Sequence, residues 1–204
     1  MSWLARITVS REQMRELCLV DDYAWHQFSW MCQPKDPDAS RTFLTRIDRA
    51  GDGGQMLILA RQKPQKPEKL SEHSWECKRI ADSFLQHRKY RFSIRANPTV
   101  RKAAGGPKGR RIGIHDSEQQ VAWLIGKGLR GGFEILPEQV TVTGSRNHQF
   151  SAGKNRRITL TSADFHGILT VTDQKQFEET FFTGIGSSKS FGMGMLLLQP
   201  IDLT

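Results

Sequence analysis

The chain has 204 residues, of which 37% are hydrophobic and 25% are charged, so its composition indicates a globular protein and excludes a disordered one. Lysine and arginine total 30 against 21 acidic residues, and the net charge of +9 favours a polyanionic partner such as nucleic acid. No apolar run reaches membrane-spanning length and no signal-peptide pattern opens the chain, so we expect a cytoplasmic protein with no membrane partner.

Three cysteines, Cys18, Cys32 and Cys77, form no CxxC pair and have no histidine at zinc-finger spacing. This pattern favours buried thiols over disulfides or metal ligands. The acidic pair Asp21 and Asp22 has no third ligand nearby, so helix capping explains it better than a metal site. We therefore expect no metal and no cofactor.

The first half of the chain reads as strands around one broken helix. Alternating apolar and polar residues indicate the strands, and the glycine-rich segment 50–54 joins two of them as a hairpin. The predicted elements are a strand over Trp3–Val9, a helix capped by Ser10 that breaks near residues 21–22 and ends about Met31, and strands over residues 42–49, 55–62 and 74–80.

The second half has a clearer β-α-β-β-α-β order. Its helix from about Asp116 has Ser117 and Gln120 at capping-box spacing, and one apolar face is formed by Val121, Leu124, Ile125 and Leu129. The predicted elements are strands over Lys89–Ala96, 133–142, 167–172 and 195–198, helices over 116–129 and 173–182, a basic loop over 101–111 and an inserted hairpin over 146–161.

Both halves fit the split βαβ unit, so we predict an α+β protein with tandem ferredoxin-like (RRM-like) domains. The first domain, residues 1–86, is a degenerate copy. The second, residues 87–204, carries the basic hairpin and a glycine-rich loop.

Tyr23 and His26 stand three residues apart and therefore lie on one face of the predicted helix. Imidazole titrates near neutral pH, and a phenol can donate a hydrogen bond. RNA carries its own nucleophile, the 2′-hydroxyl, so histidine with a nearby lysine or arginine could cleave it without a metal. On this pair alone, an ordinary histidine on a helix face is the stronger reading.

Residues 184–194 carry Gly184, Gly186 and Gly192 around Lys189. The segment fails as a nucleotide-binding Walker A loop because Ser188 stands where that motif needs glycine, and because it follows a helix and leads into a strand. Glycine-rich turns with free amides bind anions. We predict an RNA-backbone site that holds no nucleoside triphosphate, against the alternative of a flexible turn.

Two basic runs add further candidates for RNA contact. Arg101 and Lys102 open the loop over 101–111, for which a solvated surface is an equally good reading. Lys154, Arg156 and Arg157 lie near the tip of the predicted hairpin and are better placed to reach a nucleic-acid groove. Four aromatic residues could stack bases, although core packing is the favoured reading for most of them: Tyr90, Phe92, Phe165 and Phe191.

Four motifs together resemble the CasE family, the CRISPR-RNA-processing endoribonuclease of the subtype I-E Cascade complex, within the repeat-associated RNA-binding superfamily. They are Asp-Tyr-Ala-Trp-His at residues 22–26, Phe-Ser-Ile-Arg-Ala-Asn-Pro at 92–98, Val-Ala-Trp-Leu at 121–124, and Gly-Ile-Gly-Ser-Ser-Lys-Ser-Phe-Gly at 184–192. The resemblance runs from the first strand to the C-terminus and is loosest over residues 34–83.

The resemblance implies tandem ferredoxin-like domains and metal-independent cleavage of precursor CRISPR RNA at the base of the repeat stem-loop. The products would carry a 2′,3′-cyclic phosphate and a 5′-hydroxyl, and the enzyme would stay on its product and join other Cascade subunits. By position, His26 is the catalytic histidine with Tyr23 beside it, and Lys154, Arg156 and Arg157 match the groove-binding segment.

Residues 27–31 contain no basic side chain, so the cation that meets the scissile phosphate is not identified. Two alternative functions also stay open at this point. A non-catalytic RNA-binding subunit of the same superfamily would share the fold and charge, although the Tyr23 and His26 pair argues against it. A metal-dependent nuclease would need a carboxylate cluster.

Overall fold

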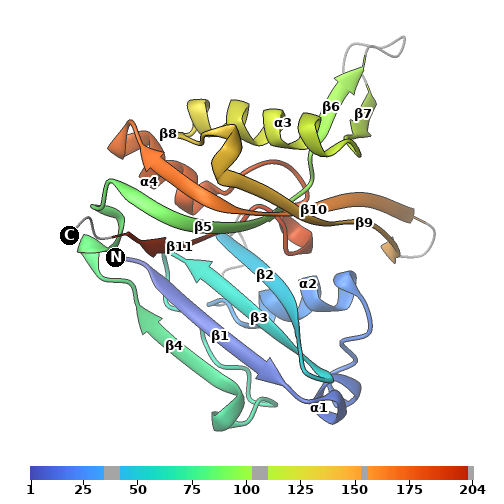
Figure 1. Ribbon diagram of the computed structural model, residues 1–204. Helices are drawn as coiled ribbons and strands as arrows, with labels where there is room; N and C mark the ends of the chain where they lie inside the picture. The colour runs from blue at the N-terminus through green and yellow to red at the C-terminus, as the bar shows by residue number, and fades with distance from the viewer. Residues whose placement is uncertain (35–41, 103–109, 153–155, 202–204) are drawn as a thin grey trace.

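The computed structural model describes residues 1–34, 42–102, 110–152 and 156–201 (Figure 1). Its α-helices are α1 Arg11–Glu16, α2 Asp22–Met31, α3 Ser117–Arg130 and α4 Gln174–Thr183. Its strands are β1 Trp3–Val9, β2 Phe43–Ala50, β3 Gly53–Ala60, β4 Trp75–Arg79, β5 Lys89–Ala96, β6 Thr99–Lys102, β7 Arg110–Gly113, β8 Phe133–Glu134, β9 Val140–Ala152, β10 Arg156–Val171 and β11 Leu196–Pro200. Short 3-10 turns are η1 Glu72–Ser74, η2 Asp82–Leu85, η3 Pro137–Gln139 and η4 Lys189–Phe191.

The first sheet has the strand order β2-β3-β1-β4, with every neighbouring pair antiparallel. Its two central strands are β1 and β3, as a split βαβ unit requires. The predicted helix does break: α1 starts at the Ser10 cap, which forms a capping box with Gln13, and α2 starts at the Asp21 cap. The predicted hairpin and the strand Trp3–Val9 are also confirmed.

The second sheet repeats this arrangement in the order β11-β5-β10-β8, and β9 also pairs with β10. Helices α3 and α4 supply Leu124 and Phe177 to the same buried cluster as Tyr90 and Phe165 of the sheet. The α+β class with tandem ferredoxin-like halves is therefore confirmed. The boundary between residues 86 and 87 stays a prediction.

Two hydrophobic clusters hold the molecule together, and one of them joins the halves. Helices α1 and α2 cover a cluster on one face of the first sheet, which includes Ile7 and Ile58. Leu44 and Leu59 lie on the other face and pack into the core of the second sheet. Because strand side chains alternate between faces, a single apolar sheet serves both cores.

Several details differ from the sequence-based expectation. The basic loop over 101–111 begins and ends as an antiparallel hairpin, β6 with β7. The cap of α3 is Asp116, whose carboxylate accepts from the amide of Gln119 at 2.9 Å, and not the predicted Ser117 box. Leu129 is 66% exposed, so it lies off the apolar face. Cys18 is exposed, whereas Cys32 is buried.

The basic hairpin is an extension of the second sheet and not a separate insertion. Strands β9 and β10 have 13 and 16 residues, and their pairing continues from the sheet to Ala152 and Arg156, with a register shift between Ser162 and Asp164. A shift of this kind bends and twists a strand pair. Figure 1 shows this hairpin and the β6–β7 hairpin projecting on the side of the molecule where α2 lies.

Candidate active site

Helix α2 carries His26 and Tyr23 on one side, and its other side packs into the core of the first half. Trp25 and Phe28 are buried in the first core, whereas Tyr23 and His26 are half-buried. The carboxylate of Asp21 accepts from the amide of Ala24 at 2.8 Å and so caps the first turn. The Tyr23 and His26 rings have centroids 6.3 Å apart, which confirms that the two side chains are neighbours on one face.

The glycine loop of the second half packs against this helix. Its turn η4 places the Phe191 ring 5.7 Å from the His26 ring, and Trp30 of α2 lies 6.4 Å from His26 on another side. Phe191 is thus placed against the histidine, whereas Tyr90, Phe92 and Phe165 are buried as core residues. His26 therefore lies at the junction of the two halves, between side chains from both.

The backbone conformation of this loop explains why glycine stands at three of its positions. Gly184, Gly186 and Gly192 all have φ between 75° and 84°, which favours glycine strongly. A Cβ at Gly192 would lie 3.2 Å from the side chain of Ile47, and one at Gly184 would lie 2.9 Å from that of Leu44. Two of the glycines therefore let the loop approach strand β2 of the first half.

Other motif residues also meet at this loop. The Asn97 amide donates to the Ser188 hydroxyl at 2.7 Å, and the ring of Trp123 packs where a Cβ at Gly186 would stand, at 3.1 Å. Two predicted RNA-binding cations, Arg101 and Lys189, line one pocket beside the loop. The structure thus brings three sequence motifs together around residues 184–192.

The two hairpins carry the remaining predicted RNA contacts that the structure describes. Lys102 is exposed at the end of β6. Arg156 and Arg157 begin β10 and pair with Ala152 and Ser151 of β9, but their side chains are outside the described part of the structure. Lys154 is also outside the described residues.

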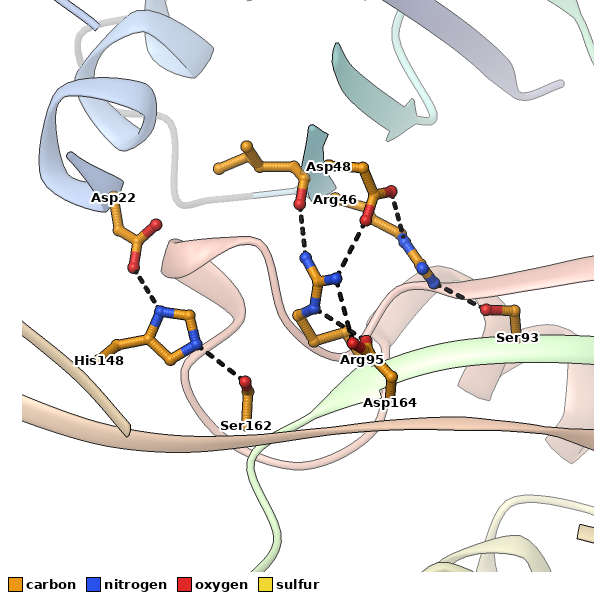
Figure 2. Close-up of polar contacts among 9 residues, drawn as sticks. Asp22, Arg46, Asp48, Ser93, Arg95, His148, Ser162 and Asp164 are labelled. Atoms are coloured by element: carbon orange, nitrogen blue, oxygen red, sulfur yellow. Dashed lines mark hydrogen bonds and ion pairs between the residues drawn. The ribbon is translucent and has the colours of Figure 1, made fainter. Parts of the chain in front are cut away.

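Arg95 joins the two halves next to the site (Figure 2). Its guanidinium donates to both carboxylate oxygens of Asp164, at 2.8 and 3.2 Å, and to the carbonyl of Ile47 at 2.6 Å. It also forms a 3.1 Å ion pair with Asp48, which in turn pairs with Arg46 at 2.8 Å. Burial alone would lower the pKa of Arg95, but the bonds to Asp164 and the charge of Asp48 outweigh it and raise the pKa.

A second polar link ties the start of α2 to the basic hairpin (Figure 2). Nδ1 of His148 lies 2.9 Å from the Asp22 carboxylate, and its Nε2 lies 2.8 Å from the Ser162 hydroxyl. Asp22 is four residues before His26, on the same helix. No local sequence pattern indicates this link, because Asp22 and His148 are 126 residues apart in the chain.

The arrangement supplies a titratable imidazole, a phenol and several cations at one junction, which suits proton transfer beside a polyanion. Among the described residues, no group of three or more His, Cys, Asp or Glu side chains is placed to hold a metal ion. Within the same residues, no helix is long and apolar enough to cross a membrane.

Comparison with known proteins places the chain in a family. The family described as "CRISPR associated protein" matches residues 2–200. The "CRISPR system Cascade subunit CasE" of Escherichia coli K12 is 27% identical, over 98% of this chain and all of that protein. The "CRISPR-associated endoribonuclease Cse3" of Thermus thermophilus is 25% identical, over 78% of this chain and 88% of that protein. A solved structure of Thermus thermophilus Cse3, "bound to an RNA representing a pre-cleavage complex", has a TM-score of 0.80 and 23% identity, with 98% of this chain and 99% of that one covered. The resemblance seen in the sequence motifs is confirmed, and the chain belongs to this CRISPR-associated protein family.

Proposed function

We propose that the chain is an endoribonuclease that cleaves precursor CRISPR RNA at the base of the repeat stem-loop and stays bound as a subunit of a Cascade complex. The observation that carries this proposal is the position of His26 of α2, whose ring packs against Phe191 of the glycine loop in the second half. The names of the Escherichia coli and Thermus thermophilus relatives, a Cascade subunit and a CRISPR-associated endoribonuclease, point to the same role.

The reaction we propose needs no metal ion. The 2′-hydroxyl attacks the adjacent phosphate, the bond to the 5′-oxygen breaks, and the products carry a 2′,3′-cyclic phosphate and a 5′-hydroxyl. His26 transfers the proton that this exchange requires, and Tyr23 helps to orient the reacting groups. Lys189 begins the turn that ends at Phe191, so it is close enough in sequence to supply positive charge near His26.

For binding, we propose that the RNA backbone contacts the glycine loop and the two hairpins. The proposed contacts are Gly184, Gly186, Gly192 and Lys189 in the loop, Arg101 and Lys102 on β6, Arg156 and Arg157 at the start of β10, and Lys154, which precedes them in the sequence. Lys189→Ala should reduce RNA affinity and leave the melting temperature unchanged. Micromolar ATP binding by the wild type that is lost in Lys189→Ala would favour a nucleotide site instead.

The central experiment is a single-turnover cleavage assay on repeat RNA with His26→Ala. We expect the rate to fall by roughly 10²–10⁴, the usual contribution of one acid–base group, with nearly unchanged RNA affinity. Tyr23→Phe should cost less. Cleavage should persist in EDTA and stop when the 2′-hydroxyl next to the scissile phosphate is removed.

The same assay separates this function from that of a non-cleaving RNA-binding subunit, which would bind the repeat and leave it intact. Full activity in His26→Ala would remove the histidine from the mechanism. A strict requirement for Mg²⁺, or cleavage of the 2′-deoxy substrate, would contradict attack by the RNA's own hydroxyl.

A further inference from the structure

A pocket of about 600 Å³ lies beside the glycine loop, between that loop, helix α3 and the β6–β7 hairpin. Four cations from three separate segments line it: Arg101, Arg111, Lys127 and Lys189. Arg111 ends the basic loop over 101–111 that the sequence suggested for RNA contact, whereas Lys127 of α3 lies outside every segment suggested for RNA binding. None of the described residues that line the pocket is acidic, so the pocket carries a concentrated positive charge.

Three of the four cations have no acidic partner among the described side chains. The ion pairs among the described side chains involve none of Arg101, Arg111 and Lys127. Arg101 and Arg111 stand directly opposite each other across the hairpin, an arrangement of like charges that destabilises a strand pair. Burial, followed by the charges of Arg130 and Arg111, lowers the pKa of Lys127. An anion in the pocket would offset the repulsion among these positive charges.

The wall formed by the loop offers hydrogen bonds as well as charge. The hydroxyl of Ser187, a lining residue, is buried and has no hydrogen-bond partner among the described residues. Ser188 has φ of 63°, a left-handed conformation that is costly for a residue with a Cβ and is typical of functional sites. The Asn97 amide donates to the Ser188 hydroxyl and holds this turn in place.

An aromatic side chain completes the pocket. Trp123 is half-buried, and its ring stacks on Phe165 with centroids 6.4 Å apart. Nζ of Lys127 lies 5.6 Å from the Trp123 ring centroid. Phosphate-binding cations beside an aromatic ring are the combination with which proteins bind single-stranded nucleic acid, where the strand can bend to place a phosphate in a concave site.

We propose that this pocket binds a backbone phosphate of the single-stranded RNA that flanks the repeat stem-loop, close to the site of cleavage. The closeness follows from the loop itself, since Lys189 lines the pocket and Phe191, in the same turn, contacts His26. The inference rests on the proposed function for the identity of the RNA. The flank on either side of the cut offers the same phosphate chemistry.

The test compares Arg111→Gln/Lys127→Gln with a control that loses the same charge, Arg88→Gln/Lys175→Gln. Both control residues are exposed in the second half and neither lines the pocket. The probes are the stem-loop without flanks and two short single-stranded RNAs that match the upstream and downstream flanks. Affinity is measured over a range of salt concentrations, and a thermal melt of each variant accompanies the assay.

We expect the pocket variant to bind one of the two flanking RNAs about tenfold or more weakly, with a log–log salt slope that falls by about 0.7 for each lost phosphate contact. The flank that loses affinity identifies the side of the cut. Binding of the flank-free stem-loop should stay unchanged, as should all binding by the control variant.

Equal binding of both flanks by wild type and pocket variant, in proteins with equal melting temperatures, would overturn the proposal. So would an equal loss on the flank-free stem-loop, because the pocket would then serve the stem. Cleavage of the stem-loop by the wild type is scored separately. If the wild type does not cleave the stem-loop, the proposed function is contradicted. A loss of flank binding in Arg111→Gln/Lys127→Gln would then still support the pocket as a phosphate site.

Discussion

Replacing Arg95 with methionine is expected to loosen the joint between the two halves of the molecule. Methionine keeps the apolar stem of arginine but removes the guanidinium that donates to Asp164 and to the Ile47 carbonyl and pairs with Asp48. Asp48 and Ile47 belong to β2 of the first half, and Asp164 belongs to β10 of the second. The variant therefore leaves polar groups on both sides of the joint without their shared partner.

The magnitude follows from how far these groups are removed from water. The side chains of Arg95 and Asp164 are 19% and 15% exposed, so this pair is mostly buried. Removing one member of a buried pair costs roughly 3–5 kcal/mol. We expect the lower end, about 3 kcal/mol, because Asp48 keeps Arg46 as a partner. For a protein of this size, that corresponds to a fall in melting temperature of roughly 6–12 °C.

The matched control is Arg6→Met, which removes an arginine from a 2.6 Å pair with Glu76 whose side chains are 49% and 67% exposed. Such exposed pairs contribute about 1 kcal/mol or less. Urea unfolding and thermal melts measure both variants. Equal destabilisation by Arg95→Met and Arg6→Met would refute the reasoning from burial.

The same variant tests whether the joint matters for catalysis. In the proposed function, His26 of the first half acts on RNA that the basic hairpin of the second half holds, so a displacement between the halves would move the scissile phosphate relative to the histidine. A misplacement of about 1 Å can cost up to about 10²-fold in rate. We expect slower single-turnover cleavage by Arg95→Met under conditions where the protein is still folded, and an unchanged rate for Arg6→Met.

Three further predictions concern the polar link through His148, which is called the tether below, the glycine loop and the β9–β10 hairpin. His148→Ala removes the hydrogen bond to Asp22 at the start of α2 and the hydrogen bond to Ser162 of β10, so cleavage should slow while the stem-loop is still bound. An unchanged rate would mean that the tether is dispensable. Gly192→Ala, at φ of 76°, should destabilise the fold by about 1–2 kcal/mol, whereas Gly126→Ala inside α3 should stabilise it by up to about 1 kcal/mol, as thermal melts would show. Changing Arg156 and Arg157 together to alanine should reduce the salt slope of RNA binding by roughly 0.7–0.9 for each lost contact, and an unchanged slope would make them solvated surface residues.

The sheets could be predicted because their strands carry a one-sided apolar pattern. Lys89–Ala96 buries every second side chain, and the sequence shows that alternation directly. The β6–β7 hairpin has no such pattern, since its apolar cross-strand pair, Val100 and Ile112, stays 43% and 38% exposed and joins no core. The cap of α3 was misplaced because Asp116 and Ser117 are adjacent and both are good cap residues.

The candidate site could be predicted only where its contacts are local. Tyr23 and His26 are neighbours because a helix places residues three apart on one face, and this needs no tertiary information. The link from His148 to Asp22, and the bonds from Arg95 to Asp164 and Ile47, join residues far apart in the chain. No sequence window contains both partners, so their pairing appears only once the two sheets are in place.

The pocket shows the same limit for charge. Considered by its sequence position alone, Lys127 is an ordinary cation in the last turn of a helix, where its charge interacts favourably with the negative end of the helix dipole. In the folded chain it lines the same pocket as Lys189, because the glycine loop packs beside α3 and Gly186 leaves room for the edge of the Trp123 ring. A glycine of the loop therefore leaves room for a ring on α3, the helix that carries Lys127. The proposed function at this junction depends on the packing between segments, so we expect the conformation of the loop to matter as much as its own lysine.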